Sequence, residues 1–372
     1  MAALEAMVAL RHLAEERVDL TLVAPDRLFT YRPLAVAEPF GLGSVVRFPL
    51  EELAGDCGAI YEQGSVALVS PNERSVYTSR SRSLEYDALL VACGARTTEA
   101  LPGAVTFGGP SDTRAIDMLL EDLESGLVRR VVFAVPAGVG WTLPVYELAL
   151  LTADRVASGR LDAELTLVTP EEEPLGVFGS EASGTIESLL DERGVLLRTG
   201  VHPRAFAGSE LEVVGAEPIA ADWVLTIPRL AGRIVEGIPQ DKDGFIATDE
   251  FGRVKGTPGV YAAGDITTFP VKQGGIAAQQ ADAVAEAIAA EAGVDITPTP
   301  FEPVLRGLLL TGGRPAFLRA MVAGGHGDTS IVHPEPLWWP AGKIAALYLG
   351  PYLAEHAVSP SGSRYEPSRL LL

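Results

Sequence analysis

The fold class that the sequence predicts is α/β, with two related units of helices and strands followed by a small C-terminal α+β region. Its 372 residues are enough for two or three domains, at about 150 residues per domain. Two observations predict this class. A helix–strand pattern occurs twice along the chain, and short apolar runs end in glycine turns that open helices.

The repeat relates residues 21–26, Thr-Leu-Val-Ala-Pro-Asp, to residues 166–171, Thr-Leu-Val-Thr-Pro-Glu. A helical stretch with an early glutamate precedes each copy, at Glu5 and at Glu147. The second copy also has an apolar, β-branched run at residues 130–135, which predicts a buried strand before a glycine turn. The equivalent strand and Gly-x-Gly turn of the first copy would lie before the first residue, so we expect the functional protein to extend further at its N-terminus.

Further helices and strands follow from apolar periodicity and from glycine or proline at their ends. A helix is expected at residues 111–125, with Ser111 and Asp112 as cap candidates. His326 and His333 flank a Gly-Asp-Thr loop, and residues from about Pro360 onward form a loose tail. The other expected elements are strands at 84–92 and 259–263, a helix at 274–292, and a hairpin of strands at 304–310 and 316–322.

Charge and composition limit the function classes. The formal net charge is -20, from 49 acidic and 29 basic residues, which disfavours nucleic acid and anionic lipid as partners. The longest apolar run near the C-terminus, at residues 344–349, is too short to span a membrane. No signal peptide is recognisable, because Glu5, Glu15 and Glu16 interrupt the N-terminal stretch. We therefore expect a cytoplasmic protein without a transmembrane segment.

The cysteines and histidines indicate a reducing compartment and no metal site. The two cysteines, Cys57 and Cys93, are far apart in sequence, which fits a reducing compartment without a disulfide framework. None of the five histidines has a ligand-like neighbour, so no metal site is expected.

Residues 260–265, Val-Tyr-Ala-Ala-Gly-Asp, form an apolar strand that ends in Gly-Asp, and a Lys-Gln-Gly-Gly turn opens the helix that follows. This order resembles the second FAD motif of the pyridine nucleotide-disulfide oxidoreductase superfamily. The resemblance implies that the aspartate binds the ribityl chain and that the helix N-terminus faces the flavin pyrimidine, where it stabilises the charge of reduced flavin. The lysine is the candidate catalytic residue, as a positive charge near the ring. The flavin-binding residues implied here are Gly264, Asp265, Lys272, Gln273, Gly274 and Gly275.

Three further segments resemble the same superfamily. Residues 86–95 are similar to its strand ending in Ala-Thr-Gly, with Cys93 in place of threonine as a packed, inert residue near the dinucleotide. Residues 31–34, Tyr-Arg-Pro-Leu, resemble a segment of sulfide:quinone oxidoreductases, flavocytochrome c sulfide dehydrogenases and type II NADH dehydrogenases. Residues 136–148 resemble the sulfide-oxidoreductase branch most. These segments and the remnant of the first FAD fingerprint imply that Ala3, Glu5, Asp26, Arg32, Pro33, Cys93 and Gly94 also contact FAD, with Asp26 on the adenosine ribose or, equally, a solvated turn residue.

The resemblance implies two Rossmann-like, three-layer dinucleotide-binding domains plus a small C-terminal α+β region. The first part of the FAD domain would cover residues 1–100, the second, NAD(P)-type domain residues 101–250, the second part of the FAD domain residues 251–294, and the C-terminal region residues 295–372. The NAD(P) turn departs from the family pattern, since only Gly140 matches a fingerprint glycine and Trp141 and Pro144 crowd the turn. Thr169 stands where an acidic residue would bind the ribose, so use of NAD(P)H stays open.

The function expected from these features is that of an FAD-dependent oxidoreductase that passes electrons from an unidentified small-molecule donor to an acceptor, with a quinone as one candidate. A persulfide mechanism is not supported, because no cysteine follows Cys93. The alternatives are a type II NADH dehydrogenase-like enzyme and a flavin-free, non-enzymatic relic. The amides of Gln279 and Gln280 fit either a quinone carbonyl or a helix surface, and Trp338-Trp339 fits a peripheral membrane contact, a packed lid or an oligomer contact.

Overall fold

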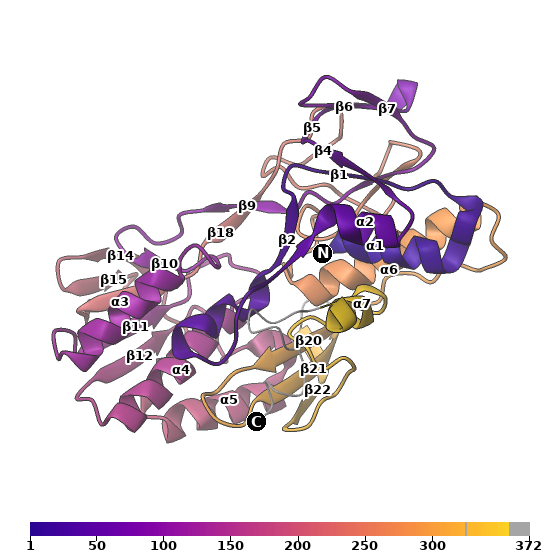
Figure 1. The fold of residues 1–372 in the computed structure, drawn as a ribbon. Helices are drawn as coiled ribbons and strands as arrows, with labels where there is room; N and C mark the ends of the chain where they lie inside the picture. The colour runs from indigo at the N-terminus through magenta and orange to yellow at the C-terminus, as the bar shows by residue number, and fades with distance from the viewer. Residues whose placement is uncertain (324–325, 357–372) are drawn as a thin grey trace.

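The structure, a computed structural model, describes residues 1–323 and 326–356. The tail expected from about Pro360 onward lies outside the described residues. The chain forms two lobes (Figure 1), and two antiparallel strands connect them: β9 (Ala95–Thr98) and β18 (Arg229–Gly232).

The second lobe is built on a five-stranded parallel sheet, in the order β10-β17-β11-β12-β13. Alternate residues of β11 face opposite layers: Val131 and Phe133 pack with the helices, and Val132 and Ala134 pack with a small antiparallel sheet. This gives a three-layer arrangement. Its strands are β10 (Val105–Thr106), β11 (Arg130–Ala134), β12 (Glu164–Val168), β13 (Val195–Arg198) and β17 (Trp223–Thr226), its helices α3 (Thr113–Glu124), α4 (Leu143–Gly159) and α5 (Ser180–Glu192), and its small sheet β14 (Pro203–Ala207), β15 (Glu210–Val213) and β16 (Ile219–Ala220).

The first lobe contains two separate parallel strand pairs, β1 with β4 and β8 with β19. Helices α1 (Ala2–Ala14) and α6 (Gly274–Glu291) pack side by side through small residues such as Ala6, Ala9 and Ala281 (Figure 1). The remaining elements of this lobe are β1 (Thr21–Ala24), β2 (Leu28–Tyr31), β3 (Val46–Pro49), α2 (Leu50–Asp56), β4 (Ile60–Gln63), β5 (Val66–Ser70), β6 (Ser75–Thr78), β7 (Ser83–Glu85), β8 (Leu89–Val91) and β19 (Val260–Ala262).

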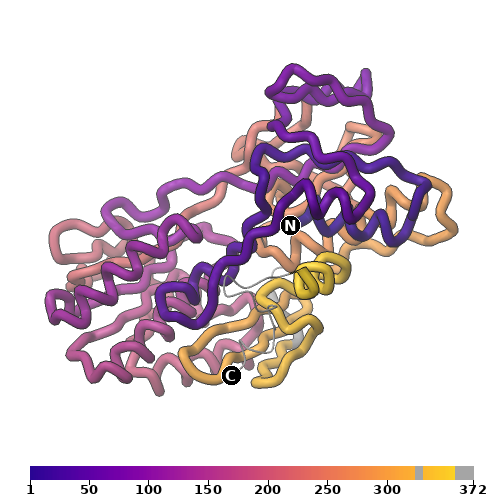
Figure 2. The backbone as a smooth tube through the Cα atoms, in the orientation of Figure 1, coloured from indigo at the N-terminus to yellow at the C-terminus, as the bar shows by residue number. Residues whose placement is uncertain are grey.

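One segment of the first lobe reaches the second. The short 3-10 helices η2 (Arg32–Val36) and η3 (Glu38–Phe40) extend away from β2 (Figure 2). Ala35 and Val36 are buried in the same core as the helices of the second lobe. This contact gives the two lobes a shared apolar interface in addition to the β9–β18 connection.

The C-terminal region is an antiparallel sheet of β20 (Val304–Leu309), β21 (Ala316–Ala323) and β22 (His326–His333), followed by α7 (Leu349–His356). The predicted hairpin is confirmed. The expectation of a loop between His326 and His333 was wrong, because these residues form β22. Its backbone pairs with β21, which supplies hydrogen bonds that compensate for the glycine and polar residues in this stretch.

The helices predicted before each repeat copy are present as α1 and α4, but one strand prediction was wrong. The expected strand at residues 84–92 is divided into β7 and β8, which belong to different sheets. Between them Asp87 is fully exposed, so the chain leaves one sheet and enters the other there. Asp112 does occupy the N-cap position of α3, but its carboxylate accepts the N–H of Gly108 at 2.7 Å and not an N–H of the helix.

The return from the second lobe occurs at β18. Val235, Ile238 and Ile246, which follow β18, are buried with Val69 and Val260 of the first lobe. We therefore propose to place this domain boundary at β18, before the boundary expected at residue 250.

Candidate functional site

The turn after β19 brings the start of α1 and the start of α6 together. Gly264 has a φ of +82°, a conformation that favours glycine, and its N–H donates to Oε1 of Gln280 at 2.7 Å. A Cβ at this position would lie 3.3 Å from Cβ of Ala277 and 3.4 Å from Cβ of Ala2. The glycine thus lets a sharp turn fit between two helix N-termini, and the next residue, Asp265, follows that turn.

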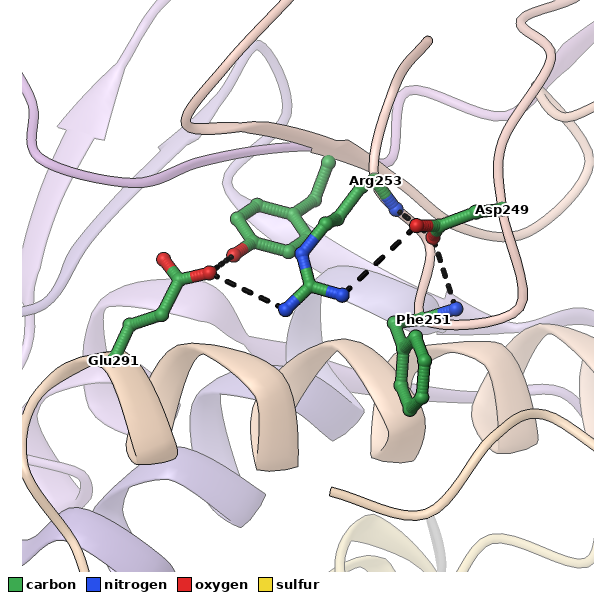
Figure 3. Close-up of polar contacts among 5 residues, drawn as sticks. Asp249, Phe251, Arg253 and Glu291 are labelled. Carbon is green, nitrogen blue, oxygen red and sulfur yellow. Dashed lines mark hydrogen bonds and ion pairs between the residues drawn. The ribbon is translucent and has the colours of Figure 1, made fainter. Parts of the chain in front are cut away.

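Contacts at the C-terminal end of α6 fix this helix against β19. The hydroxyl of Tyr261 donates to Glu291, the last residue of α6, at 2.7 Å. Figure 3 shows Arg253 between Glu291 and Asp249, with the Arg253–Glu291 ion pair at 3.4 Å. The carboxylate of Asp249 also accepts the N–H groups of Phe251 and Arg253 (Figure 3). With both ends held, the strand and the helix present the Gly-Asp turn in a defined place.

The carboxylate of Asp265 is half-buried and accepts no hydrogen bond from any residue that the structure describes. Burial raises its pKa, while the positive charges of Lys272, the Met1 amino group and Arg32 oppose this rise. A half-buried carboxylate with unused acceptors is costly unless a donor completes it. The arrangement fits the hydroxyl groups of a ligand such as the ribityl chain of FAD.

Lys272 lies beside this carboxylate. Its ammonium donates to the carbonyl oxygen of Thr267 and lies 4.1 Å from the centroid of the Phe245 ring, a cation–π contact. Burial lowers the pKa of Lys272 to about 8, with Asp265 and Asp241 opposing the shift. The lysine is therefore mostly charged at neutral pH, but poised to lose its proton within the physiological range.

The start of α6 is covered by the C-terminal segment. Gln273 caps the helix through the Ile276 N–H and donates to the carbonyl oxygen of Arg306, so its amide is fully engaged within the protein. A Cβ on Gly274 would lie 2.5 Å from Cδ1 of Ile344. The two glycines thus permit the close approach of residues 344–345, a role that the sequence did not indicate.

The residues expected from the first FAD motif are distributed around this turn. Ala3 and Glu5 lie in the first turn of α1, and Arg32 and Pro33 open η2. Asp26 is exposed just after β1, where its carbonyl oxygen accepts the Tyr61 hydroxyl. Gly94, with a φ of +68°, follows β8.

Cys93 differs from its prediction. The side chain is exposed to solvent, so the expectation of a packed residue was wrong. It lies beyond the last residue of β8, where the sheet no longer covers it. Protein atoms close to the thiol raise its pKa, and Arg233 opposes this shift, so the thiol form is favoured.

The glutamates of the two repeat copies have equivalent partners, which sequence reasoning missed. Glu5 accepts the N–H groups of Tyr348 at 2.8 Å and Leu349 at 2.7 Å, at the start of α7. Glu147 accepts the N–H of Leu310 at 2.8 Å and forms a fully buried ion pair with Lys343. Both glutamates therefore hold the C-terminal region. Their shared position in the repeat was the available signal.

A second carboxyl group, that of Asp282 on α6, lies against Glu5. Burial raises the pKa of both groups, that of Asp282 to about 9, with the charge of Glu5 and the hydrogen bond between them contributing. Glu5 already accepts two backbone N–H groups, whereas Oδ1 of Asp282 is buried without a partner among the described residues. The shared proton therefore belongs on Asp282.

The glycine turn of the second lobe is occupied by the protein itself. A Cβ on Gly140 would lie 2.0 Å from the carbonyl oxygen of Pro270, so this turn packs directly on the first lobe. Beside it, Glu171 accepts three hydroxyl groups, those of Tyr146 at 2.6 Å, Thr169 at 2.7 Å and Thr142 at 3.1 Å. A cleft of about 450 Å³ opens next to Gly140 and Glu171.

An apolar cavity adjoins the N-terminal end of α1. The aromatic and aliphatic residues that line it come from the first lobe and from the C-terminal segment: Tyr31, Leu34, Phe48, Ile344 and Leu353. Trp338 packs nearby on Phe317, whereas Trp339 is 78% exposed. The cavity has a volume of about 50 Å³, so only a small apolar group fits between these walls as they stand.

The two glutamines of α6 have structural partners. The amide of Gln279 donates to the carbonyl oxygen of Val304 and accepts its N–H. The amide of Gln280 accepts the N–H of Gly264 and donates to the hydroxyl of Thr267. Their amides are thus engaged inside the protein, and a role in binding a quinone carbonyl is disfavoured. Within the described residues, no helix is long and apolar enough to cross a membrane, and no group of three or more His, Cys, Asp or Glu side chains could hold a metal ion.

The two lobes, the parallel sheets and the Gly-Asp turn between helix N-termini are features of the FAD/NAD(P)-binding Rossmann-like fold. Residues 6–287 match the pyridine nucleotide-disulphide oxidoreductase family, and the chain belongs to it.

A curated relative is an NADH dehydrogenase-like protein of Mycobacterium tuberculosis, 31% identical over 242 residues. The match covers 60% of this chain and 59% of that protein, so the chain spans less than two thirds of its relative. Among solved structures, the sulfide:quinone oxidoreductase of Aquifex aeolicus is similar, with a TM-score of 0.79, 18% identity, and coverage of 89% of this chain and 84% of that chain.

Two further solved structures share the fold. A ferredoxin reductase from Rhodopseudomonas palustris has a TM-score of 0.65 and 18% identity, covering 87% of this chain and 81% of its own. The NDH2 of Plasmodium falciparum, solved with NADH, has a TM-score of 0.57 and 18% identity, covering 70% and 62%. At such identities the likeness shows the fold alone.

Proposed function

We propose that this protein is an FAD-dependent oxidoreductase that passes electrons from a small-molecule donor to an acceptor. The observation that carries the proposal is Asp265, a half-buried carboxylate whose acceptors no described residue uses, at the turn between two helix N-termini. When bound, FAD would supply the redox chemistry. The protein would supply binding, orientation and electrostatic stabilisation.

Individual residues have distinct parts in this proposal. Asp265 accepts hydrogen bonds from the ribityl hydroxyls. The N-terminus of α1, which lacks a side-chain cap, faces the phosphates, since unpaired N–H groups at a helix start bind anions. Lys272 supplies positive charge close to the isoalloxazine ring, and Arg32 adds a second cation beside Asp265. No redox disulfide is used, because the chain has only Cys57 and Cys93.

The acceptor that the structure supports best is a small apolar one, of which a quinone is an example. The support is the apolar lining of the cavity between the first lobe and residues 340–354; its volume of about 50 Å³ is small, so a quinone requires the walls to move apart. A cytoplasmic location with a peripheral membrane contact through the exposed Trp339 is compatible with this proposal.

The direct test is the FAD content of the purified protein and of an Asp265→Ala variant. The wild type is expected to show the visible absorbance bands of flavin, or to take up added FAD. The variant should bind FAD roughly 10- to 100-fold more weakly, because a hydrogen bond to a charged group contributes about 1.5–3 kcal/mol. The exposed Asp295 gives the matched control, Asp295→Ala, whose affinity should equal that of the wild type. Equal FAD affinity in all three proteins would refute the assignment.

A second candidate is an NAD(P)H oxidoreductase of the type II NADH dehydrogenase kind, which the 31% identity to the NADH dehydrogenase-like relative favours. The cleft beside Glu171 supports it as well. Against it stands Gly140, whose backbone packs on Pro270 where a pyrophosphate would approach. Anaerobic addition of NADH and NADPH to the FAD-loaded protein separates the two: bleaching of the flavin band supports this candidate, and an unchanged spectrum supports a different donor.

A further inference from the structure

Two arginines lie directly opposite each other in the C-terminal sheet. Arg306 of β20 pairs in register with Arg319 of β21. Directly opposed residues in antiparallel strands have Cβ atoms about 4.5–5.5 Å apart, so the two side chains leave the same face of the sheet side by side. Both are half-buried.

Neither guanidinium makes a hydrogen bond or an ion pair with any residue that the structure describes. Arg314, on the same hairpin, differs in that it pairs with Glu335. Burial lowers the pKa of Arg306, and Arg319 lowers it further as a neighbouring like charge. The pair is therefore a local concentration of uncompensated positive charge.

This arrangement is unfavourable for the protein alone. Like charges placed directly across a sheet destabilise it, and partial burial strengthens the repulsion. The chain has 49 acidic residues against 29 basic ones, yet no described carboxylate is paired with either arginine. A feature that costs stability in this way is typical of a binding site.

The surroundings of the pair are open and partly apolar. Ile331 of β22 lies opposite Arg319 and is 46% exposed, and Met321, at the irregularity two residues further along β21, is 41% exposed. Apolar neighbours exclude water from one side of a bound anion and strengthen its charge-assisted hydrogen bonds.

We propose that Arg306 and Arg319 form a binding site for an oxyanion of the phosphate class, carried either by a small molecule or by a lipid headgroup. Planar guanidinium groups bind phosphate oxygens in a bidentate manner, and two of them side by side match a single tetrahedral anion. The site is independent of the flavin proposal. It adjoins the start of α6, because the carbonyl oxygen of Arg306 accepts the Gln273 amide at 2.9 Å.

The test is titration of the full chain with inorganic phosphate, followed by calorimetry and by thermal unfolding. Wild type should bind phosphate and unfold at a higher temperature in its presence. Arg306→Gln and Arg319→Gln should each weaken binding by at least about tenfold, the loss of one charge-assisted contact. Arg314→Gln, which removes an arginine with a carboxylate partner, is the matched control and should bind as wild type does.

Two further measurements complete the test. Without phosphate and at low salt, Arg306→Gln and Arg319→Gln should unfold at the same or a higher temperature than wild type, because the repulsion between the two arginines is relieved. Such a result would show that weaker phosphate binding by the variants is not caused by misfolding. Vesicles of phosphatidylglycerol, compared with phosphatidylcholine, identify the source: binding to the former alone, without binding of free phosphate, indicates a lipid headgroup. Equal behaviour of wild type and both variants towards phosphate and vesicles would overturn the proposal.

Discussion

Replacing Asp282 by asparagine tests whether the carboxyl pair between α1 and α6 shares a proton. The pKa of Asp282 is raised to about 9 in the folded protein, and an unfolded aspartate has a pKa of about 3.9. Between these values the folded state binds a proton that the unfolded state has lost. Stability from this group is therefore fully present at acid pH and decreases as the pH rises towards 9.

The magnitude follows from proton linkage. One extra bound proton in the folded state lowers the free energy of unfolding by up to about 1.4 kcal/mol for each pH unit. Between pH 6 and pH 8 the wild type should thus lose up to about 3 kcal/mol through this pair. Glu5 faces Asp282 from α1, and Glu286 and Tyr348 complete its charged or titratable surroundings.

Urea unfolding at pH 6, 7 and 8 measures the effect. Asparagine does not titrate and can still donate a hydrogen bond to Glu5, so Asp282→Asn should show a flatter decrease of stability with pH than wild type. Asp295→Asn, an exposed aspartate just after α6, removes the same charge without a carboxyl partner and should follow the wild-type slope. If the Asp282→Asn and wild-type curves run parallel, the pair does not share a proton and this reasoning is wrong.

Three other predictions concern packing and charge. Gly140→Ala should destabilise the protein by roughly 1–3 kcal/mol in urea unfolding, because the added methyl overlaps a backbone oxygen at 2.0 Å, whereas Gly55→Ala, in open space on α2, should not. Glu147→Gln should cost about 3–5 kcal/mol by leaving the Lys343 ammonium buried without its charge partner, and the double variant Glu147→Leu with Lys343→Met should cost less than the single one. Serine at both cysteine positions should leave flavin reduction within about tenfold of wild type in stopped-flow assays; a larger loss in a folded protein would show that a thiol takes part.

Local pattern was enough to predict the elements that carry the turn at Asp265. The strand β19 and the helix α6 combine an apolar run with flanking glycines, and each lies within two residues of its expected bounds, while α1 and α4 precede the two repeat copies as expected. The exposure of Cys93 and the strand β22 were not predicted, because both depend on which neighbouring segment covers or pairs with the backbone.

The repeat indicated a shared role for the two glutamates, but local pattern did not identify their partners. Glu147 bonds a residue 163 positions away, and Glu5 bonds one 344 positions away, so no local window contains either contact. The apolar periodicity predicted the helix that carries each glutamate, but it did not predict which group the carboxylate binds. The expectation that Glu5 contacts FAD stays a prediction, and the structure adds that its carboxylate accepts two N–H groups of the C-terminal segment.

The C-terminal segment connects the two lobes through these two equivalent glutamates. Lys343 bonds Glu147 at the start of α4, and six residues later Leu349 bonds Glu5 at the start of α1. Between them Ile344 lies so close to Gly274 that a Cβ there would be only 2.5 Å away. One short stretch of chain is thus anchored on the same position of both repeat units and covers the N-terminus of α6, which the family resemblance placed towards the flavin pyrimidine. A movement of one lobe relative to the other must therefore extend residues 343–349 or break the contact at Glu147 or at Glu5. The relative placement of the lobes, and access to the cavity that residues 344–354 help to line, are therefore set by the C-terminal segment as much as by the β9–β18 connection.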